Sequence, residues 1–385
     1  MDSADKIELM GRFAQFDLCG ICTPRTAESQ RRRSPLGRWI YPAVLPDGKT
    51  VRLLKLLLTN VCLNDCTYCV NRCSRAVPRS GFEPAELAEL FSTLWHKGLV
   101  QGFFLSSGVQ RNPDFTMARM IRTVEIVRKR YGFRGYVHLK ILPGASFDAV
   151  EGAMRVATRV SVNLEAPSPE RLAEIAAGKD FHTDLVQRMG WVRSILEQGS
   201  TQCVDHTTQF VVGAAEESDS EILSLTERLY GEMKLKRAYY SAFQPVEEEV
   251  REGRRPTPPL REHRLYQADF LMRRYGFTFE ELSFDRSGNL PAETDPKRVW
   301  VAKHPERFPV EINRASREEL LRVPGIGPRS AGRIVTRRVK EKFHTLEELK
   351  GTGAVIGWAA PYVLISGKSV AEVKEPGQLW FWKEQ

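Results

Sequence analysis

The chain has no long hydrophobic run and few cysteines for its 385 residues. No uninterrupted apolar stretch approaches the roughly 20 residues that a membrane-spanning helix needs, so we expect no membrane association. The first ten residues carry Asp2, Asp5 and Glu8 where a secretory signal needs an apolar core, which predicts a cytoplasmic protein. The seven cysteines are an odd number, and in a reducing compartment they indicate metal or redox use rather than a disulfide framework.

Acidic residues are also in deficit, with 48 Asp and Glu against 57 Lys and Arg. The resulting net charge of +9 suits a polyanionic partner such as nucleic acid. Hydrophobic residues make up 42% of the chain, which is enough for a real core, and the length predicts one large domain with a smaller one.

Three cysteines stand close together in the segment TNVCLNDCTYCVNRC. Cys62, Cys66 and Cys69 form the pattern C-x3-C-x2-C directly after the apolar run 51–58, which predicts a buried strand. Three thiolates on one loop can hold three irons of a [4Fe–4S] cluster and leave the fourth iron open to a cofactor or substrate. Cys73 leaves an alternative open, because a fourth sulfur would complete a closed cluster or a zinc site.

The other cysteines give weaker signals. Cys19 and Cys22 form a C-x2-C pair, for which a second cluster, a redox pair and two free thiols all remain open. Cys203 stands alone, and we expect it to be a small buried hydrophobic residue.

Strand-like and helix-like segments alternate after the cysteine loop. The predicted strands are 51–58, 102–106, 136–142, 159–165, 207–213 and 237–243. Six βα units in this order predict an α/β fold with a parallel sheet and helices outside it. In barrels of this kind the polar residues at the carboxyl ends of the strands form the ligand site. Those ends carry Ser106, Ser107, Gly108, Asn163, Glu165, Val211, Gly213, Glu216 and Phe243.

A second motif, LLRVPGIGPRSAGRIV, covers residues 320–335. It predicts a helix over 316–322, a tight turn at Gly325-Ile-Gly327 and a second helix that begins at Pro328. This pattern resembles a helix-hairpin-helix module. The glycines let the backbone approach a phosphate closely, and the positive end of the second helix attracts it.

The second helix of this motif also carries regularly spaced cations. Arg329, Arg333 and Arg337 share one predicted helix face and could track neighbouring phosphates. Such a hairpin binds backbone and does not read sequence. Segment 345–367, with Gly351-Thr-Gly353 at its turn, resembles a degenerate second hairpin. A scaffold or protein-docking role is the alternative.

The cysteine loop resembles that of the radical S-adenosylmethionine superfamily, and most of the chain resembles one of its families closely. This is the DNA modification/repair radical SAM family, linked to uracil-DNA-glycosylase-like proteins. The shared strings are LLTN-C around Asn60, FLSSGV around Ser107, YVHLK around His138, HRLYQAD around Tyr266 and HPERFPV around Phe308. The resemblance implies a partial (β/α)6 TIM-type barrel, with a small all-α helix-hairpin-helix domain at the C-terminus.

The resemblance also implies cofactors and roles. Cys62, Cys66 and Cys69 would hold a [4Fe–4S] cluster, and the cofactor would be S-adenosylmethionine. Its binding residues would be Tyr68, Ser106, Ser107, Gly108, Asn163, Glu165, Val211, Gly213, Glu216 and Phe243. The turn at 106–108 departs from the superfamily's Gly-Gly-Glu type because it has no carboxylate. His138 and Lys140 on the third strand are candidate catalytic residues for proton transfer or phosphate contact.

The resemblance, together with the hairpin, implies reductive cleavage of S-adenosylmethionine to a 5′-deoxyadenosyl radical that acts on nucleic acid, in DNA modification or repair. A tRNA or other RNA substrate is one alternative, and a non-catalytic iron–sulfur DNA-binding protein is another. Expected partners are a low-potential electron donor such as flavodoxin or ferredoxin and a uracil-DNA-glycosylase-like protein. The predicted parts are an extension (1–50), the barrel (51–250), a linker and connecting helix (251–308), the hairpin domain (309–370) and an aromatic tail (371–385).

Overall fold

The structure is a computed structural model, and it describes residues 6–7, 9–11, 40–44, 50–199, 201–245 and 253–369. The chain divides into two units, Met1–Tyr266 and Gln267–Gln385. The expectations for Cys19, Cys22 and the aromatic tail fall outside the described residues. No described helix combines the length and the apolar character that a bilayer crossing requires.

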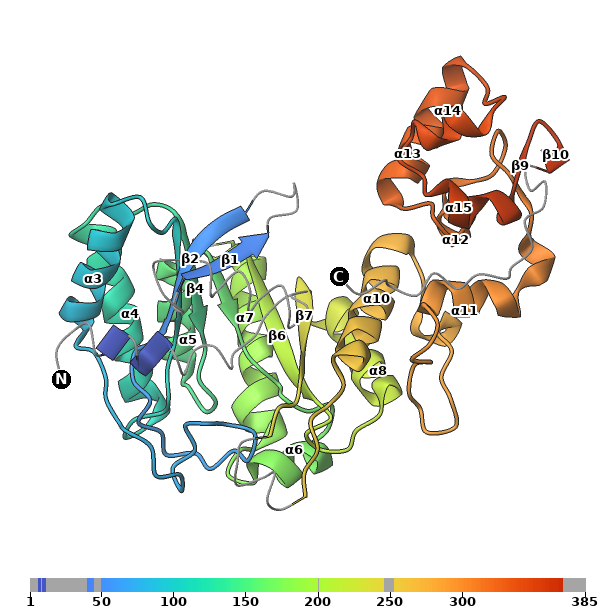
Figure 1. Ribbon diagram of the computed structural model, residues 1–385. Coiled ribbons are helices and arrows are strands. Elements are labelled where there is room, and N and C mark those ends of the chain that lie inside the picture. The colour runs from blue at the N-terminus through green and yellow to red at the C-terminus, as the bar shows by residue number, and fades with distance from the viewer. Residues whose placement is uncertain are drawn as a thin grey trace, which may run out of the picture. The chain divides into compact units, whose positions relative to one another are not determined.

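Unit 1 is built on a curved seven-stranded sheet whose strands lie side by side in chain order (Figure 1). The strands are β1 (Ile40–Val44), β2 (Thr50–Leu57), β3 (Gly102–Ser106), β4 (Tyr136–Lys140), β5 (Arg159–Ser161), β6 (Asp205–Val212) and β7 (Arg237–Ala242). Neighbouring strands from β2 to β7 are parallel, which confirms the predicted βα alternation. Strand β1 pairs antiparallel with β2 and was not foreseen.

Helices connect the parallel strands and pack beside one another: α3 against α4, α4 against α5, and α5 against α7. The helices of this unit are α3 (Pro84–His96), α4 (Pro113–Lys129), α5 (Phe147–Val156), α6 (Pro169–Ala176), the π-helix η1 (Phe181–Val186), α7 (Gln187–Gln198) and α8 (Asp219–Glu232). Helix α4 shows why the sequence folds this way. Asn112 caps its first turn by accepting from Phe115 N, and Pro113 occupies the first helical position. Met117, Val124 and Val127 lie on its buried face.

The core of unit 1 lies between these helices and the sheet. Leu54 and Leu56 of β2 have no exposed surface. Phe91 of α3 stacks on Phe103 of β3 at 4.7 Å between ring centroids. Cys203 is buried, as predicted. This packing holds the carboxyl ends of β2 to β6 in place, and the candidate site lies at those ends.

Helix α10 (Pro259–Tyr275) runs across the boundary between the units and lies within the predicted linker and connecting helix. Unit 2 contains η2 (Phe279–Glu281), α11 (Pro296–Lys303), η3 (Pro305–Arg307), α12 (Arg317–Arg322), α13 (Pro328–Lys340), α14 (Leu346–Lys350), α15 (Ile356–Ala359) and η4 (Ala360–Tyr362). A small sheet of β8 (Val310–Glu311), β9 (Val363–Ile365) and β10 (Lys368–Ser369) adds strands to a unit for which only helices were expected. Leu320, Ile334 and Phe343 are fully buried in its core.

Candidate functional site

The cysteines lie on a long loop that starts at the carboxyl end of β2 and is closed at its base. Thr59 forms an antiparallel bridge with Gly81. The Asn60 side chain donates to the Pro78 carbonyl at 2.7 Å and accepts from Ser80 N at 2.8 Å. The loop therefore returns to its starting point, and its base is anchored to the end of the sheet.

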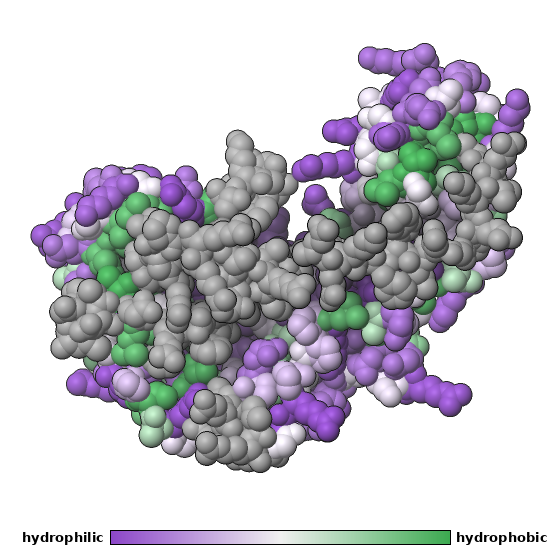
Figure 2. Space-filling model, viewed as in Figure 1, coloured by the Kyte–Doolittle hydropathy of each residue, from purple (hydrophilic) through white to green (hydrophobic). Residues whose placement is uncertain are grey.

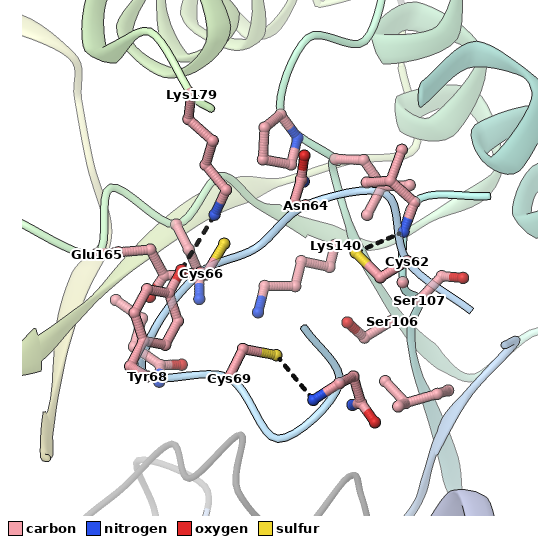
Figure 3. A pocket seen from close by; sticks show the side chains of 18 of the residues that line it. Cys62, Asn64, Cys66, Tyr68, Cys69, Ser106, Ser107, Lys140, Glu165 and Lys179 are labelled. Atoms are coloured by element: carbon pink, nitrogen blue, oxygen red, sulfur yellow. Dashed lines mark hydrogen bonds between the residues drawn. The ribbon is translucent and has the colours of Figure 1, made fainter. Parts of the chain in front are cut away.

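All three cysteines of the motif line one cavity at this edge of the sheet (Figure 3). The Cys62 sulfur accepts from Val109 N at 3.4 Å, and the Cys69 sulfur accepts from Asn71 N at 3.4 Å. Cys66 is 6% exposed. By contrast, Cys73 is exposed and does not line the cavity. The structure thus brings three sulfurs of the loop together and leaves the fourth outside.

The spacing of the sulfurs bears on the zinc alternative. Across the described ranges, no three His, Cys, Asp or Glu side chains are grouped closely enough to hold a single metal ion. Zinc requires such a group, because its ligands share one ion at about 2.0–2.3 Å. A four-iron cluster instead binds each thiolate to a different iron, so its ligands can lie further apart. In the described structure the cavity is lined by Cys62, Cys66 and Cys69, and Cys73 lies outside it.

Residues at the ends of four neighbouring strands complete the cavity. The lining includes Tyr68, Asn71, Ser106, Ser107, Gly108, Lys140, Asn163, Glu165, Lys179, Gln209 and Val211. Gly108 has no room for a side chain, since a Cβ there would lie 2.5 Å from the Val61 carbonyl oxygen. Within the described chain, Ser107 Oγ and Asn163 Nδ2 are buried with no hydrogen-bond partner. Buried polar atoms are nearly always bonded, so these two indicate a polar ligand.

Glu165 occupies a strained backbone position at the cavity wall. Its φ of 66° lies in the left-handed region, and its side chain is 7% exposed. Its N–H donates to the Gln209 carbonyl at 2.9 Å, and its own carbonyl accepts from Val211 N at 2.8 Å. These bonds to β6 hold the strained backbone, which brings the carboxylate into the cavity.

Lys179 is a cavity residue that the sequence did not suggest. It lies between α6 and η1, and its ammonium donates to Tyr68 Oη at 3.0 Å (Figure 3). Burial by itself lowers the pKa of Lys179, but the negative charges of Cys66 and Glu165 outweigh burial and raise it. Lys179 therefore remains a cation inside the cavity.

Burial has the opposite consequence for the acidic groups. It raises the pKa of the Cys69 thiol to about 12, with a further contribution from the charge on Cys66. Burial, followed by the charge on Cys66, also raises the pKa of Tyr68 well above its usual value. A thiol must lose its proton to bind a metal, so metal binding here would release protons.

Four residues predicted for the site lie outside the cavity: His138, Gly213, Glu216 and Phe243. His138 lies deeper in the sheet, edge-on to Phe104, whereas Lys140 from the same strand reaches the cavity. Glu216 is exposed, and it is the buried neighbour Glu217 that accepts from Ala215 N at 3.0 Å. The turn after β6 leaves Glu216 exposed and buries Glu217, and neither residue lines the cavity.

The hairpin predicted in the C-terminal region forms as expected, but its first glycine has a structural role. Ser316 caps α12, the turn follows Val323, and α13 begins at Pro328. Gly325 has a φ of 77°, and a Cβ there would lie 2.4 Å from the Val355 carbonyl oxygen. Its own carbonyl accepts from Val355 N at 2.9 Å. Gly325 thus allows close packing against the second hairpin.

Two of the three predicted phosphate-binding arginines contact the second hairpin instead. Arg333 donates to the Thr352 carbonyl at 3.1 Å, and Arg337 lies 3.6 Å from the Glu348 carboxylate. Arg329 at the start of α13 is exposed. Figure 2 shows hydrophilic side chains gathered around the part of the molecule that α13 and α14 occupy. Arg333 is exposed as well, and Arg337 is half-buried, so the predicted face of three arginines keeps two exposed members, of which Arg333 also contacts the second hairpin.

A comparison with family models agrees with the predicted hairpin. A family model of the helix-hairpin-helix motif matches residues 307–353, which confirms the predicted motif. No curated protein matches the chain.

Similar solved structures include the FeFe-hydrogenase maturase HydG from Carboxydothermus hydrogenoformans, with 15% identity, a TM-score of 0.45, and coverage of 56% of this chain and 50% of that one. Methylornithine synthase (PylB) has 17% identity and a TM-score of 0.45, with coverage of 56% and 60%. The cobalamin-dependent S-adenosylmethionine radical enzyme OxsB with aqua-cobalamin bound has 10% identity and a TM-score of 0.34, with coverage of 86% and 54%. The chain thus corresponds to about half to three fifths of each of these structures.

Proposed function

We propose that this chain is a radical S-adenosylmethionine enzyme that acts on nucleic acid, most specifically in DNA modification or repair. The observation that carries the proposal is the shared cavity of Cys62, Cys66 and Cys69 with the unpartnered polar atoms of Ser107 and Asn163. Three cysteines without a fourth match a cluster that keeps one iron open for a ligand.

The residues of the cavity fit both cofactors. The three cysteines would hold the cluster. Ser107 and Asn163 offer hydrogen-bonding atoms for the amino-acid part of S-adenosylmethionine, and Lys179 offers a cation for its carboxylate. Glu165 offers an anion for its amino group. When bound, the cluster and S-adenosylmethionine supply a 5′-deoxyadenosyl radical that removes a hydrogen atom from the substrate.

The protein's own part in this chemistry is to hold and orient. The hydrogen bonds from Val109 N and Asn71 N to two of the sulfurs stabilise negative charge on them. The strained backbone of Glu165 fixes the position of its carboxylate. Lys140 lies among the cysteines in Figure 3 and offers a second cation for an anionic substrate group.

Nucleic acid is the proposed substrate because of the helix-hairpin-helix motif and the charge around it. Residues 311–350 carry ten Lys or Arg and six Asp or Glu, a net charge of +4. The resemblance to the DNA modification/repair family favours DNA over RNA. A base in duplex would have to leave the stack to reach the cavity. A low-potential donor such as flavodoxin or ferredoxin would supply the electron, and a uracil-DNA-glycosylase-like protein is a candidate partner.

The test is anaerobic reconstitution with iron and sulfide, followed by measurement of 5′-deoxyadenosine formed with dithionite and S-adenosylmethionine. Cys66→Ala should lose both the cluster signal in electron paramagnetic resonance and the product. Cys73→Ala is the matched control from the same loop, and it should keep both because Cys73 lies outside the cavity. If Cys73→Ala loses the cluster, the site is closed and the structural-cluster alternative is correct.

A further inference from the structure

The guanidinium of Arg79 binds four backbone carbonyls of the cysteine loop. One terminal nitrogen donates to Asn60 O at 2.6 Å and to Asn71 O at 2.8 Å. The other donates to Arg72 O at 2.6 Å and to Arg75 O at 2.9 Å. Arg79 is half-buried. A single side chain therefore ties together four points of a loop that has no regular secondary structure to hold it.

These four carbonyls bracket the cysteines in the chain. Asn60 lies two residues before Cys62, and Asn71 and Arg72 directly follow the turn that contains Cys69. Within that turn, Cys69 N donates to the Cys66 carbonyl at 3.0 Å, and Arg72 N donates to the Cys69 carbonyl at 3.2 Å. By holding both ends of the cysteine segment, Arg79 fixes the separation of Cys62 from Cys69.

Asn71 links Arg79 to a ligand sulfur. Its carbonyl accepts from Arg79, and its N–H donates to the Cys69 sulfur at 3.4 Å. The two groups lie in adjacent peptide planes joined at the Asn71 Cα, so a carbonyl held by Arg79 limits how far the neighbouring N–H plane can turn away from the sulfur. Hydrogen bonds to the sulfurs are among the factors that set the reduction potential of an iron–sulfur cluster.

We propose that Arg79 is a positioning residue that aims the Asn71 N–H at the Cys69 sulfur and thereby raises the reduction potential of the cluster. The inference rests on the proposed function, since it requires a cluster on the three cysteines. Arginine suits this role because its planar fork carries five donors in fixed directions, whereas the ammonium of lysine is a point charge on a flexible stem. Lysine at this position would keep the charge but could not span four carbonyls.

Substitutions of Arg79 by lysine and by glutamine separate the effect of hydrogen-bond geometry from the effect of the positive charge. Arg79→Lys preserves the charge and removes part of the hydrogen-bond set, and Arg79→Gln removes the charge as well. Arg122→Gln is the control for net charge, because Arg122 lies on α4 with an exposed guanidinium that pairs with Glu125. Circular dichroism and thermal unfolding of each full-length protein establish that it is folded.

The measurement is a redox titration of the reconstituted proteins followed by electron paramagnetic resonance. The cluster of Arg79→Lys should titrate at a more negative potential than wild type, with altered g-values, and Arg79→Gln should shift further in the same direction. Arg122→Gln should match wild type. If Arg79→Gln does not fold, the Lys variant alone decides.

The outcomes are distinguishable from a failure of the proposed function. If the reconstituted wild-type protein holds no redox-active cluster, the proposed function is wrong. If the clusters of wild type and Arg79→Lys have the same reduction potential and the same g-values, Arg79 does not position the Asn71 N–H. The proposed function is unaffected by that result. A folded Arg79→Lys protein with loss of iron relative to Arg122→Gln supports the positioning role.

Discussion

Glu165 combines a strained backbone with a buried charge, and both are costly unless the surroundings compensate. A non-glycine residue in the left-handed region costs on the order of 1–3 kcal/mol. Its hydrogen bonds to Gln209 and Val211 on β6 maintain this conformation. In the proposed function, a strained residue that places a carboxylate in the cavity with three cysteines and a buried lysine would offer that carboxylate to the cofactor.

The first prediction concerns this carboxylate. Glu165→Gln should leave the cluster intact and weaken binding of S-adenosylmethionine by about 1.5–3 kcal/mol, the range for a hydrogen bond to a charged group. Isothermal titration calorimetry on the reconstituted protein measures the change. Glu216→Gln is the matched control, since Glu216 also has a positive φ but is exposed. Equal affinities for Glu165→Gln and the control would remove Glu165 from the cofactor site.

Lys297 on α11 gives a pH-dependent prediction for unit 2. It is 7% exposed, and its ammonium donates to the carbonyl of Ile326 in the hairpin turn at 2.9 Å. Burial lowers the pKa of Lys297 to about 7, although Asp295 acts in the opposite direction. The unfolded chain keeps the usual lysine pKa of 10.5. Between these values the unfolded state binds a proton that the folded state does not.

The contribution of Lys297 to the free energy of unfolding is therefore fully present above pH 10.5 and is lost as the pH falls toward 7. The free energy of unfolding should rise from pH 7.5 to 9.5 by at most about 1.4 kcal/mol per pH unit, the value of one proton. Urea titrations across this range measure the slope. In Lys297→Met the contribution of this residue is absent, and an unchanged slope in that variant would show that Lys297 is not the titrating group.

At the scale of elements, the strands could be predicted from sequence because they are buried and read as short apolar runs. Strand β3 has the predicted bounds, and β2 differs by one residue at each end. Strand β5 ends at Ser161 instead of residue 165, and the backbone enters the left-handed region at Glu165, where an isolated bridge to Phe210 resumes the pairing. Periodicity carries no signal for such a turn.

The candidate site was predicted where local motifs define it and missed where the tertiary fold does. The cysteines are three to four positions apart and form a recognisable pattern. Lys179 meets Tyr68 across 111 positions of sequence, so only the packing of α6 and η1 against the loop brings them together. Arg79 forms its four bonds through loop geometry that no spacing reveals. The side chains of Arg333 and Arg337 turn toward the second hairpin. The sequence does not reveal how that hairpin packs against α13.

The third prediction tests the hairpin as an element. If α13 presents Arg329 to a phosphate while Arg337 supports α14, the two arginines should differ in their effect on binding. Arg329→Gln should lower the slope of log affinity against log salt by about one, which corresponds to one lost phosphate contact. Arg337→Gln should leave that slope unchanged and lower the stability, since it removes the contact with Glu348. Fluorescence anisotropy of labelled duplex DNA, at several salt concentrations, measures the slopes.

The opposite result also has a clear meaning. A loss of slope in Arg337→Gln equal to that in Arg329→Gln would show that the intramolecular pair opens on binding, as the original prediction of a three-arginine face requires. Unchanged slopes in both variants would show that the hairpin is not the nucleic-acid contact and would favour a protein-docking role.

At the scale of the whole molecule, the two units have separable tasks in the proposed function. The residues that line the cavity in the described structure all belong to unit 1, whereas the hairpin motif at 307–353 belongs to unit 2. Cofactor chemistry should therefore depend on unit 1, and substrate capture on unit 2. This division would let a basic hairpin and a cysteine loop serve one reaction without sharing residues.

The last prediction follows from this separation. In the full-length Arg329→Gln protein, the rate of 5′-deoxyadenosine formation without nucleic acid should equal the wild-type rate, because no side chain of the cavity has changed. Any change in this rate that nucleic acid causes in wild type should require a higher nucleic-acid concentration in the variant, since binding is weaker. Chromatographic quantification of 5′-deoxyadenosine under both conditions measures the two rates.

Glu165→Gln is the complementary control. It should lower the rate with and without nucleic acid while keeping the wild-type affinity for DNA. A fall in the rate without nucleic acid in Arg329→Gln would show that the hairpin unit takes part in the cofactor chemistry itself, and the division of tasks would then be wrong.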